Sequence, residues 1–180
     1  MPAFFSKMKG VTTSPPRPPL KAIFVAWIGA CIAIGAIGAL ERWVAGPEGL
    51  PMLIGSFGAS AVLAFGAIKS PLAQPRNLVG GHVVSAFVGV ACAQGFPADL
   101  TWLAAAAAVA TAIALMHLTK TLHPPGGATA LIAVISGEPI RQLGYLYVLV
   151  PCLAGALIML AVALLVNNIP RESRYPQCWW

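Results

Sequence analysis

The stretch Thr119-Lys-Thr-Leu-His-Pro-Pro-Gly-Gly-Ala-Thr-Ala-Leu-Ile-Ala-Val-Ile135 decides the fold, because it sets a polar, proline- and glycine-rich motif directly before a short apolar run. Long apolar segments flank it on both sides, so we expect this break in the helical pattern to fall at membrane depth. Irregular backbone is tolerated there only where it is buried in protein or lines a cavity. A broken helix of this kind is a sequence indicator of a transport site.

The composition is that of an integral membrane protein. Of the 180 residues 58% are hydrophobic and only 9% are charged, whereas soluble domains carry about 25% charge. The length suits one domain. The net charge of +6 comes from basic residues at the segment ends, which indicates membrane orientation rather than nucleic-acid binding. The four cysteines form no metal or redox pattern.

Six hydrophobic segments follow one another, and we predict an all-α membrane domain over residues 21–166. They span residues 22–40, 50–68, 78–96, 101–119, 126–137 and 143–166. Residues 1–20 form a basic, proline-rich arm, and residues 167–180 form a polar tail. The first segment is longer than the apolar core of a signal peptide, and at about 1.5 Å per residue it reaches about 28 Å, enough to span.

Two topologies compete, and the basic residues distinguish them. If the second and fifth segments are re-entrant, four spans remain and the Lys and Arg residues divide six to five between the two sides. If all six cross, the division is nine to two, with only Arg42 and Arg141 opposite the termini. The positive-inside rule favours six crossings with both termini cytoplasmic. The second and fifth segments would then be broken or half-helices.

A weak internal repeat supports two related halves, residues 21–97 and 101–166. A shift of 69 residues aligns Gly58-Ala-Ser-Ala-Val-Leu-Ala64 with Gly127-Ala-Thr-Ala-Leu-Ile-Ala133, with four of seven positions identical. Each copy lies in the middle segment of its half. With three crossings per half the two halves would be inverted relative to each other, a common transporter architecture.

Both copies of the repeat are predicted helix starts. The N–H groups of a first helical turn lack internal partners, and the helix dipole adds positive character there. Small residues let a small anion approach this backbone, although glycines at these positions equally suit close helix packing. The predicted binding residues are Ser56, Gly58, Ala59, Ser60, Pro124, Pro125, Gly126, Gly127, Ala128 and Thr129.

His123 is the main candidate among the ionisable residues, since an ionisable group inside a membrane segment indicates function. We expect it to donate a hydrogen bond to the anion or to carry a coupled proton, the alternative being a capping residue at the interface. His82, Arg76 and Asn77 are possible supporting residues. No carboxylate or thiol cluster accompanies the histidines, so we predict no metal site and no cofactor. His123 has no evident acid–base partner, and we predict no enzyme activity.

The sequence resembles the HPP family of integral membrane proteins. The resemblance rests on Leu122-His-Pro-Pro-Gly-Gly-Ala-Thr-Ala-Leu-Ile-Ala-Val134, Gly55-Ser-Phe-Gly-Ala-Ser-Ala-Val62, Pro71-Leu-Ala-Gln-Pro-Arg-Asn77, Gly80-Gly-His82 and the tail from Asn167-Asn168 to Trp179-Trp180. Plastid and cyanobacterial members are associated with nitrite transport, so the resemblance implies a transporter of nitrite or a similar small anion. The family is usually described with four transmembrane segments, whereas the charge distribution favours six.

The expected function is therefore small-anion transport, with the anion held at opposed helix N-termini near the membrane centre. The alternatives are a passive channel of the same fold and a non-transporting sensor or assembly module. The expected partners are the lipid bilayer and the anion, with homo-oligomerisation possible and no nucleic acid. The expected location is a bacterial inner membrane.

Overall fold

A computed structural model describes residues 2–9, 12–45 and 51–180, and the described residues contain helices but no strand. The helices are α1 (Pro2–Ser6), α2 (Leu20–Leu40) continuing as η1 (Glu41–Ala45), α3 (Gly55–Ala61) continuing as η2 (Val62–Gly66), η3 (Pro71–Ala73), α4 (Pro75–Gly95), η4 (Ala98–Leu100), α5 (Thr101–Leu118), α6 (Pro124–Ile135), α7 (Glu138–Arg141), η5 (Val148–Leu153) and α8 (Ala154–Val166). The predicted all-α class is confirmed.

Among the residues that the structure describes, four helical stretches are long and apolar enough to cross a membrane. They are Leu20–Trp43, Pro75–Gly95, Ala98–Leu118 and Val148–Val166. The second and fifth predicted segments are short helices instead, and the 12 residues of α6 rise only about 18 Å. Length alone thus gives four spans, and the six-crossing arrangement stays a prediction.

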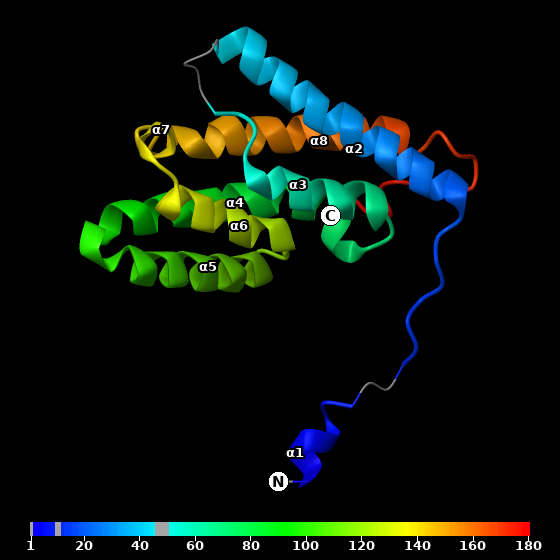
Figure 1. Cartoon of the computed structure of the whole chain (residues 1–180), viewed down its shortest axis with the longest axis horizontal. Helices are drawn as coiled ribbons and strands as arrows, with labels where there is room; N and C mark the ends of the chain where they lie inside the picture. Colours follow the sequence, from blue (N-terminus) through cyan, green and yellow to red (C-terminus); the bar gives the residue numbers. More distant parts are fainter. Residues whose placement is uncertain (1, 10–11, 46–50) are drawn as a thin grey trace.

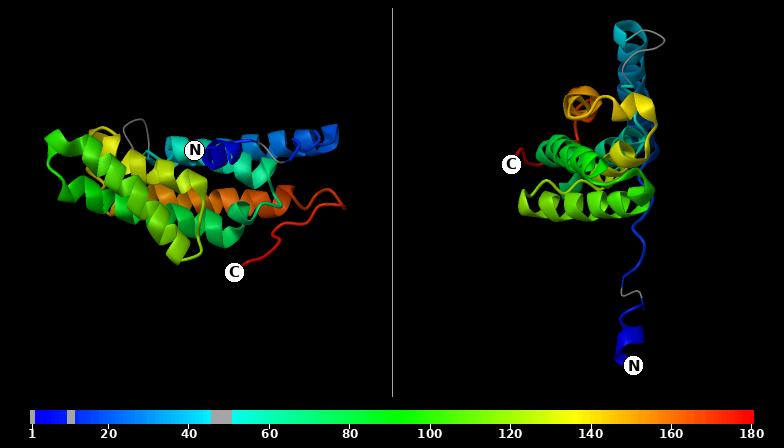
Figure 2. Two further views of the ribbon diagram at one scale, coloured as in Figure 1. Left: turned by 90° about the horizontal axis from the view of Figure 1, so that it is seen from below. Right: turned by 90° about the vertical axis from the view of Figure 1, so that its left-hand side faces the viewer.

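The helices α2, α3, α4, α5, α6 and α8 form a bundle and run back and forth roughly along one axis, whereas α1 lies outside it (Figures 1 and 2). The helix α4 packs against both α5 and α6, while α2 packs against α8 and against the α3–η2 segment. Many large apolar side chains remain exposed on the outside, among them Trp27, Phe87 and Leu165. Such a surface is suited to contact with lipid rather than water.

Small residues allow the central helices to approach closely. Ala104, Ala108 and Ala112 form a fully or almost fully buried stripe on α5, as the i, i+4 spacing of a helical face requires. On α4, a Cβ added at Gly89 would lie 2.6 Å from the carbonyl oxygen of Ala130 in α6. Small residues thus let α4 pack closely against α5 and α6.

The last span begins later than predicted. Residues 143–147 form turns and a short helical stretch rather than the start of a continuous span, and Gly144 has a φ of +50°. Pro151 lacks an N–H group, and Val150 before it has extended backbone angles, because a residue that precedes proline avoids the helical region. The long helix is thus interrupted where the sequence analysis expected it to be continuous.

Candidate functional site

Four buried polar side chains meet between α3, α4 and α6. Ser60 lies in the last turn of α3, His82 lies about two turns into α4, His123 directly precedes α6, and Thr129 lies within α6. All four are 0% exposed. Buried polar groups in a membrane bundle are costly unless they are hydrogen-bonded to one another, so their partners define the site.

One continuous chain of hydrogen bonds joins these side chains. The hydroxyl of Ser60 lies 2.7 Å from Nε2 of His82 and 2.8 Å from Nε2 of His123. At one end, Nδ1 of His82 lies 2.7 Å from the hydroxyl of Thr129. At the other end, Nδ1 of His123 lies 2.9 Å from the carbonyl oxygen of Leu72. Ser60 is therefore the bridge between the two imidazoles.

The carbonyl of Leu72 fixes the direction of the whole chain when both rings are neutral. A carbonyl only accepts, so Nδ1 of His123 carries the proton and Nε2 accepts from Ser60. Ser60 has a single hydrogen, so Nε2 of His82 must donate to Ser60. Nδ1 of His82 then accepts from Thr129. The two histidines consequently hold opposite tautomers, since the tautomer follows the partner of the other nitrogen.

Glycines on α4 and α6 allow the start of α6 to pack directly against α4. A Cβ added at Gly81 would lie 2.4 Å from Cβ of His123 and 2.9 Å from the carbonyl oxygen of Thr121. A Cβ added at Gly126 would lie 2.6 Å from the hydroxyl of Ser85. Close helix packing, the alternative considered for these glycines, is thus confirmed for Gly126. Gly58 has no atom within 4 Å of its added Cβ.

The start of α6 offers fewer backbone donors than we predicted. Pro124 and Pro125 have no N–H group, and the N–H of Gly126 donates to the carbonyl of His123 at 2.8 Å. The prediction of a free donor at Gly126 was therefore wrong. The N–H of Gly126 is used in a hydrogen bond within the turn and is not available to a ligand.

The two helix starts do not face each other. The last turn of α3, through Ser60, contacts the start of α6, because the two helices run in opposite directions (Figure 1). Of the predicted binding residues, Ser60, His123 and Thr129 belong to the cluster. Gly58 and Ala59 are exposed, and Gly127 and Ala128 are partly exposed. The site is formed by side chains rather than by two opposed backbone starts.

The supporting residues divide in their roles. His82 is central to the cluster. Asn77 donates from Nδ2 to the carbonyl of Leu122 at 2.8 Å and ties the start of α4 to the segment before α6. Two buried atoms, the hydroxyl of Ser56 and Nε of Arg76, have no hydrogen-bond partner among the described residues. Ser56 lies one turn before Ser60, hence on the same face of α3.

Tyr147 was not predicted as a site residue. It is 0% exposed, and its hydroxyl donates to the carbonyl of Thr129 at 3.1 Å. It thus supports α6 at the residue that bonds His82. A tyrosine within a long apolar segment gives no sequence signal that separates this role from simple packing.

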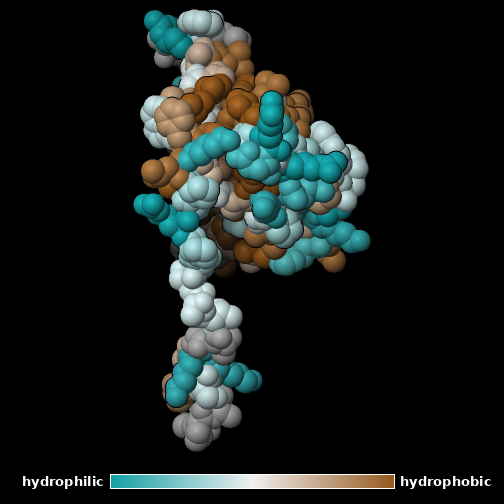
Figure 3. Space-filling view, turned by 90° about the vertical axis from the view of Figure 1, so that its right-hand side faces the viewer, coloured by the Kyte–Doolittle hydropathy of each residue, from teal (hydrophilic) through white to brown (hydrophobic). Residues whose placement is uncertain are grey.

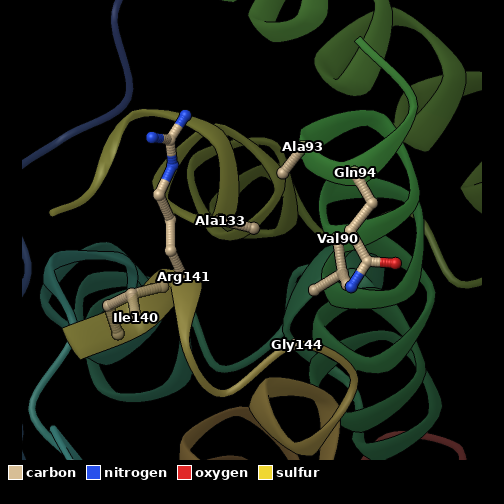
Figure 4. A pocket seen from close by; sticks show the side chains of 7 residues that line it. All are labelled: Val90, Ala93, Gln94, Ala133, Ile140, Arg141 and Gly144. Atoms are coloured by element: carbon tan, nitrogen blue, oxygen red, sulfur yellow. The ribbon is translucent and has the colours of Figure 1, made fainter. Parts of the chain in front are cut away.

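The cluster is closed in this structure. A pocket of about 120 Å³ lies between α4, α6 and the α7 region (Figure 4), and Gln94 and Arg141 are its polar lining residues. A pocket of about 390 Å³ lies between the start of α2, η2 and the tail. Neither is lined by the cluster. Within the described part of the chain, no group of three or more His, Cys, Asp or Glu residues could hold a metal ion.

Comparison with known proteins identifies the family. Residues 15–176 match the family described as HPP, transmembrane region. Two transmembrane proteins of Dictyostelium discoideum are 49% and 45% identical over 98% of this chain, which covers 57% and 63% of their lengths. No solved structure matches the chain. The chain belongs to the HPP family of transmembrane proteins, and it spans about three fifths of the length of these relatives.

Proposed function

We propose that the protein transports nitrite or a similar small inorganic anion across the membrane, and that the buried cluster recognises it. The observation that carries this proposal is the chain of hydrogen bonds through Ser60, His82 and His123 inside a bundle with membrane-length helices. Polar and ionisable residues inside a membrane protein are costly and mark substrate or ion pathways. The resemblance to family members associated with nitrite transport supports the choice of anion.

The donors of the cluster suit an anion with two oxygen atoms. Nε2–H of His82 and the hydroxyl of Ser60 already form hydrogen bonds that an anion can accept in their place. The hydroxyl of Ser56, one turn away on the same face of α3 and without a partner among the described residues, is a further donor. Because these groups are 0% exposed, the anion would reach them only after α3 and α6 move apart. A closed site of this kind suits a carrier that alternates between its two sides.

We further propose that all six apolar segments cross the membrane as two inverted halves. The alternation of chain direction in Figure 1 supports this, since each helix among α2, α3, α4, α5, α6 and α8 runs opposite to the one before. In two such halves α5 corresponds to α2, and α8 corresponds to α4. The helix packing also supports this correspondence, because α2 packs on α8 and α5 packs on α4. Ser60 and Thr129, equivalent positions of the repeat, both hydrogen bond to His82.

The proposed orientation has both termini in the cytoplasm, in a bacterial inner membrane. The connections before α4 and before α6 lie at the end of the bundle that also holds the tail, since Tyr175 bonds to Ala73 and Asn77 bonds to Leu122. Hydrophilic residues gather on this end in Figure 3. An excess of basic residues marks the cytoplasmic side.

Uptake of nitrite into proteoliposomes that contain the purified protein tests the proposal. We expect saturable uptake that His123→Ala abolishes, because that variant loses the bonds to Ser60 and to Leu72. His117→Ala is the matched control, since His117 is exposed on α5. Both variants should insert normally. The absence of flux of nitrite, nitrate, formate or chloride in the wild type would refute transport, whereas non-saturable flux would identify a channel.

A further inference from the structure

We propose that Ser60, His82 and His123 form a binding site for one exchangeable proton. The Ser60 hydroxyl passes this proton between the two imidazoles, while the Thr129 hydroxyl changes its acceptor. The use of this proton to drive uptake rests on the proposed function. The proton site itself rests on the geometry of the hydrogen bonds.

The hydroxyl of Thr129 has two acceptors within reach. Its oxygen lies 2.7 Å from Nδ1 of His82 and 3.3 Å from the carbonyl oxygen of Pro125, one turn earlier in α6. With both rings neutral, the hydroxyl hydrogen is needed at Nδ1 of His82. The carbonyl of Pro125 is therefore the alternative acceptor when Nδ1 gains a hydrogen of its own.

Protonation of His82 costs the cluster no hydrogen bond. A proton from solution adds to the lone pair on Nδ1 of His82, and the new N–H donates to the oxygen of Thr129. The hydroxyl hydrogen of Thr129 turns to the carbonyl of Pro125 at 3.3 Å. The bond from Nε2 of His82 to Ser60 remains, so every donor still has an acceptor, which buried charge requires.

The same geometry lets the charge move to the second ring. Nε2 of His82 gives its proton to the oxygen of Ser60 at 2.7 Å, while Ser60 gives its own hydrogen to Nε2 of His123 at 2.8 Å. His123 is then positively charged and donates to both Ser60 and the carbonyl of Leu72. His82 becomes neutral in the other tautomer and accepts from Ser60. The relay carries charge from α4 to the start of α6.

A second proton is excluded by the same bridge. If both rings were charged, two N–H groups would donate to Ser60, and its hydroxyl hydrogen would have no acceptor. The ring centroids lie only 5.2 Å apart, so the two charges would also repel each other in a poorly solvated site. The site thus has a capacity of one proton.

The elements packed around the pair supply no opposing charge. Tyr147, which precedes η5, donates to the carbonyl of Thr129, and Cys152 is buried within η5. His117 on α5 is exposed, and Arg76 lies on α4 itself, six residues before His82. Among the described residues, no carboxylate hydrogen bonds to either imidazole. Uptake of an anion together with the proton would neutralise the site.

Nitrogen-15 NMR of histidine-labelled protein in lipid vesicles tests the assignment, because the chain has only three histidines. At neutral pH we expect the Nε2–H tautomer at His82 and the Nδ1–H tautomer at His123, with exposed His117 as internal reference. On acidification we expect one added proton shared by the pair. Identical tautomers, or uptake of no proton or of two while the helical circular dichroism persists, would overturn the proposal.

Two variants of Thr129 provide the second test. Thr129→Val removes the acceptor that both protonated forms need, so the pair should take up its proton about 1–2 pH units lower than in the wild type. Thr129→Ser keeps the hydroxyl and should titrate like the wild type. Equal titration of the valine and serine variants would refute the change of acceptor by the Thr129 hydroxyl. Absent nitrite flux in the wild type would refute the proposed function but leave this titration unaffected.

Discussion

Gly81→Ala tests whether the contact between α4 and the start of α6 holds the cluster together. The added Cβ would lie 2.4 Å from Cβ of His123. It is fixed to the backbone of α4, and the carbonyl of Thr121 at 2.9 Å closes another direction. No side-chain rotation relieves these contacts, so the start of α6 must move away from α4.

The required movement follows from the distances. A tolerable carbon–carbon contact needs about 3.4 Å or more, so His123 must shift by about 1 Å. The bond from Ser60 to Nε2 of His123 is 2.8 Å long, and the same shift would bring it beyond hydrogen-bonding range. Overpacking and the lost polar contact together predict a loss of about 2–4 kcal/mol of stability, with loss of nitrite uptake.

Reversible unfolding in mixed detergent micelles, followed by tryptophan fluorescence, measures the effect. Gly95→Ala is the matched control at the end of the same helix, because its added Cβ meets no atom within 4 Å. We expect this control to change stability by less than about 1 kcal/mol, in the stabilising direction. Equal stability and equal uptake in the two variants would refute the reasoning, since they would show room for a methyl group between α4 and His123.

Three further outcomes are expected. His123→Asn retains a donor toward Leu72 but loses the acceptor for Ser60, so in proteoliposomes it should insert normally and lose nitrite uptake. Tyr175→Phe removes the 2.7 Å bond to Ala73 and should destabilise the protein by about 1 kcal/mol in the same unfolding assay. The hydrogen bond from Lys21 lowers the pKa of Glu172, so this ion pair is present at neutral pH and lost as the pH falls through that pKa. Because the pair is exposed, the unfolding midpoint of Glu172→Gln at neutral pH should match the wild type.

The helices could be predicted from the sequence because apolar segment length and the positions of proline and glycine determine them locally. Helix starts were expected at the two copies of the repeat, and helices do begin just before them, α3 at Gly55 and α6 at Pro124. The interruption of the last span at Val150 was not predicted, although Pro151 is a signal for it. The short α1 was not predicted either, since its five residues give too brief a pattern.

The site was only partly predictable, because its geometry depends on tertiary contacts. The repeat singled out Ser60 and Thr129, and the motif singled out His123. His82 was predicted only as a supporting residue, because nothing local indicates that its helix brings it into contact with the other three. The free backbone donors predicted at the start of α6 are missing for a local reason that the sequence contains. Two prolines have no N–H group, and the N–H of Gly126 is used within the turn.

The repeat also explains why the polar site lies on one side of the bundle. One residue before the aligned copies, Phe57 in α3 corresponds to Gly126 in α6. A Cβ added at Gly155 of α8 would lie 2.2 Å from the ring of Phe57, so this ring fills the space between α3 and α8. Because Gly126 has no side chain, α6 packs directly against α4, where Gly81 leaves room for His123. The exchange of a ring for a hydrogen at one repeat position thus leaves an apolar contact between α3 and α8 and a polar contact between α6 and α4. The ring of Phe57 also lies 5.1 Å from that of His82, so the apolar contact forms one wall of the site.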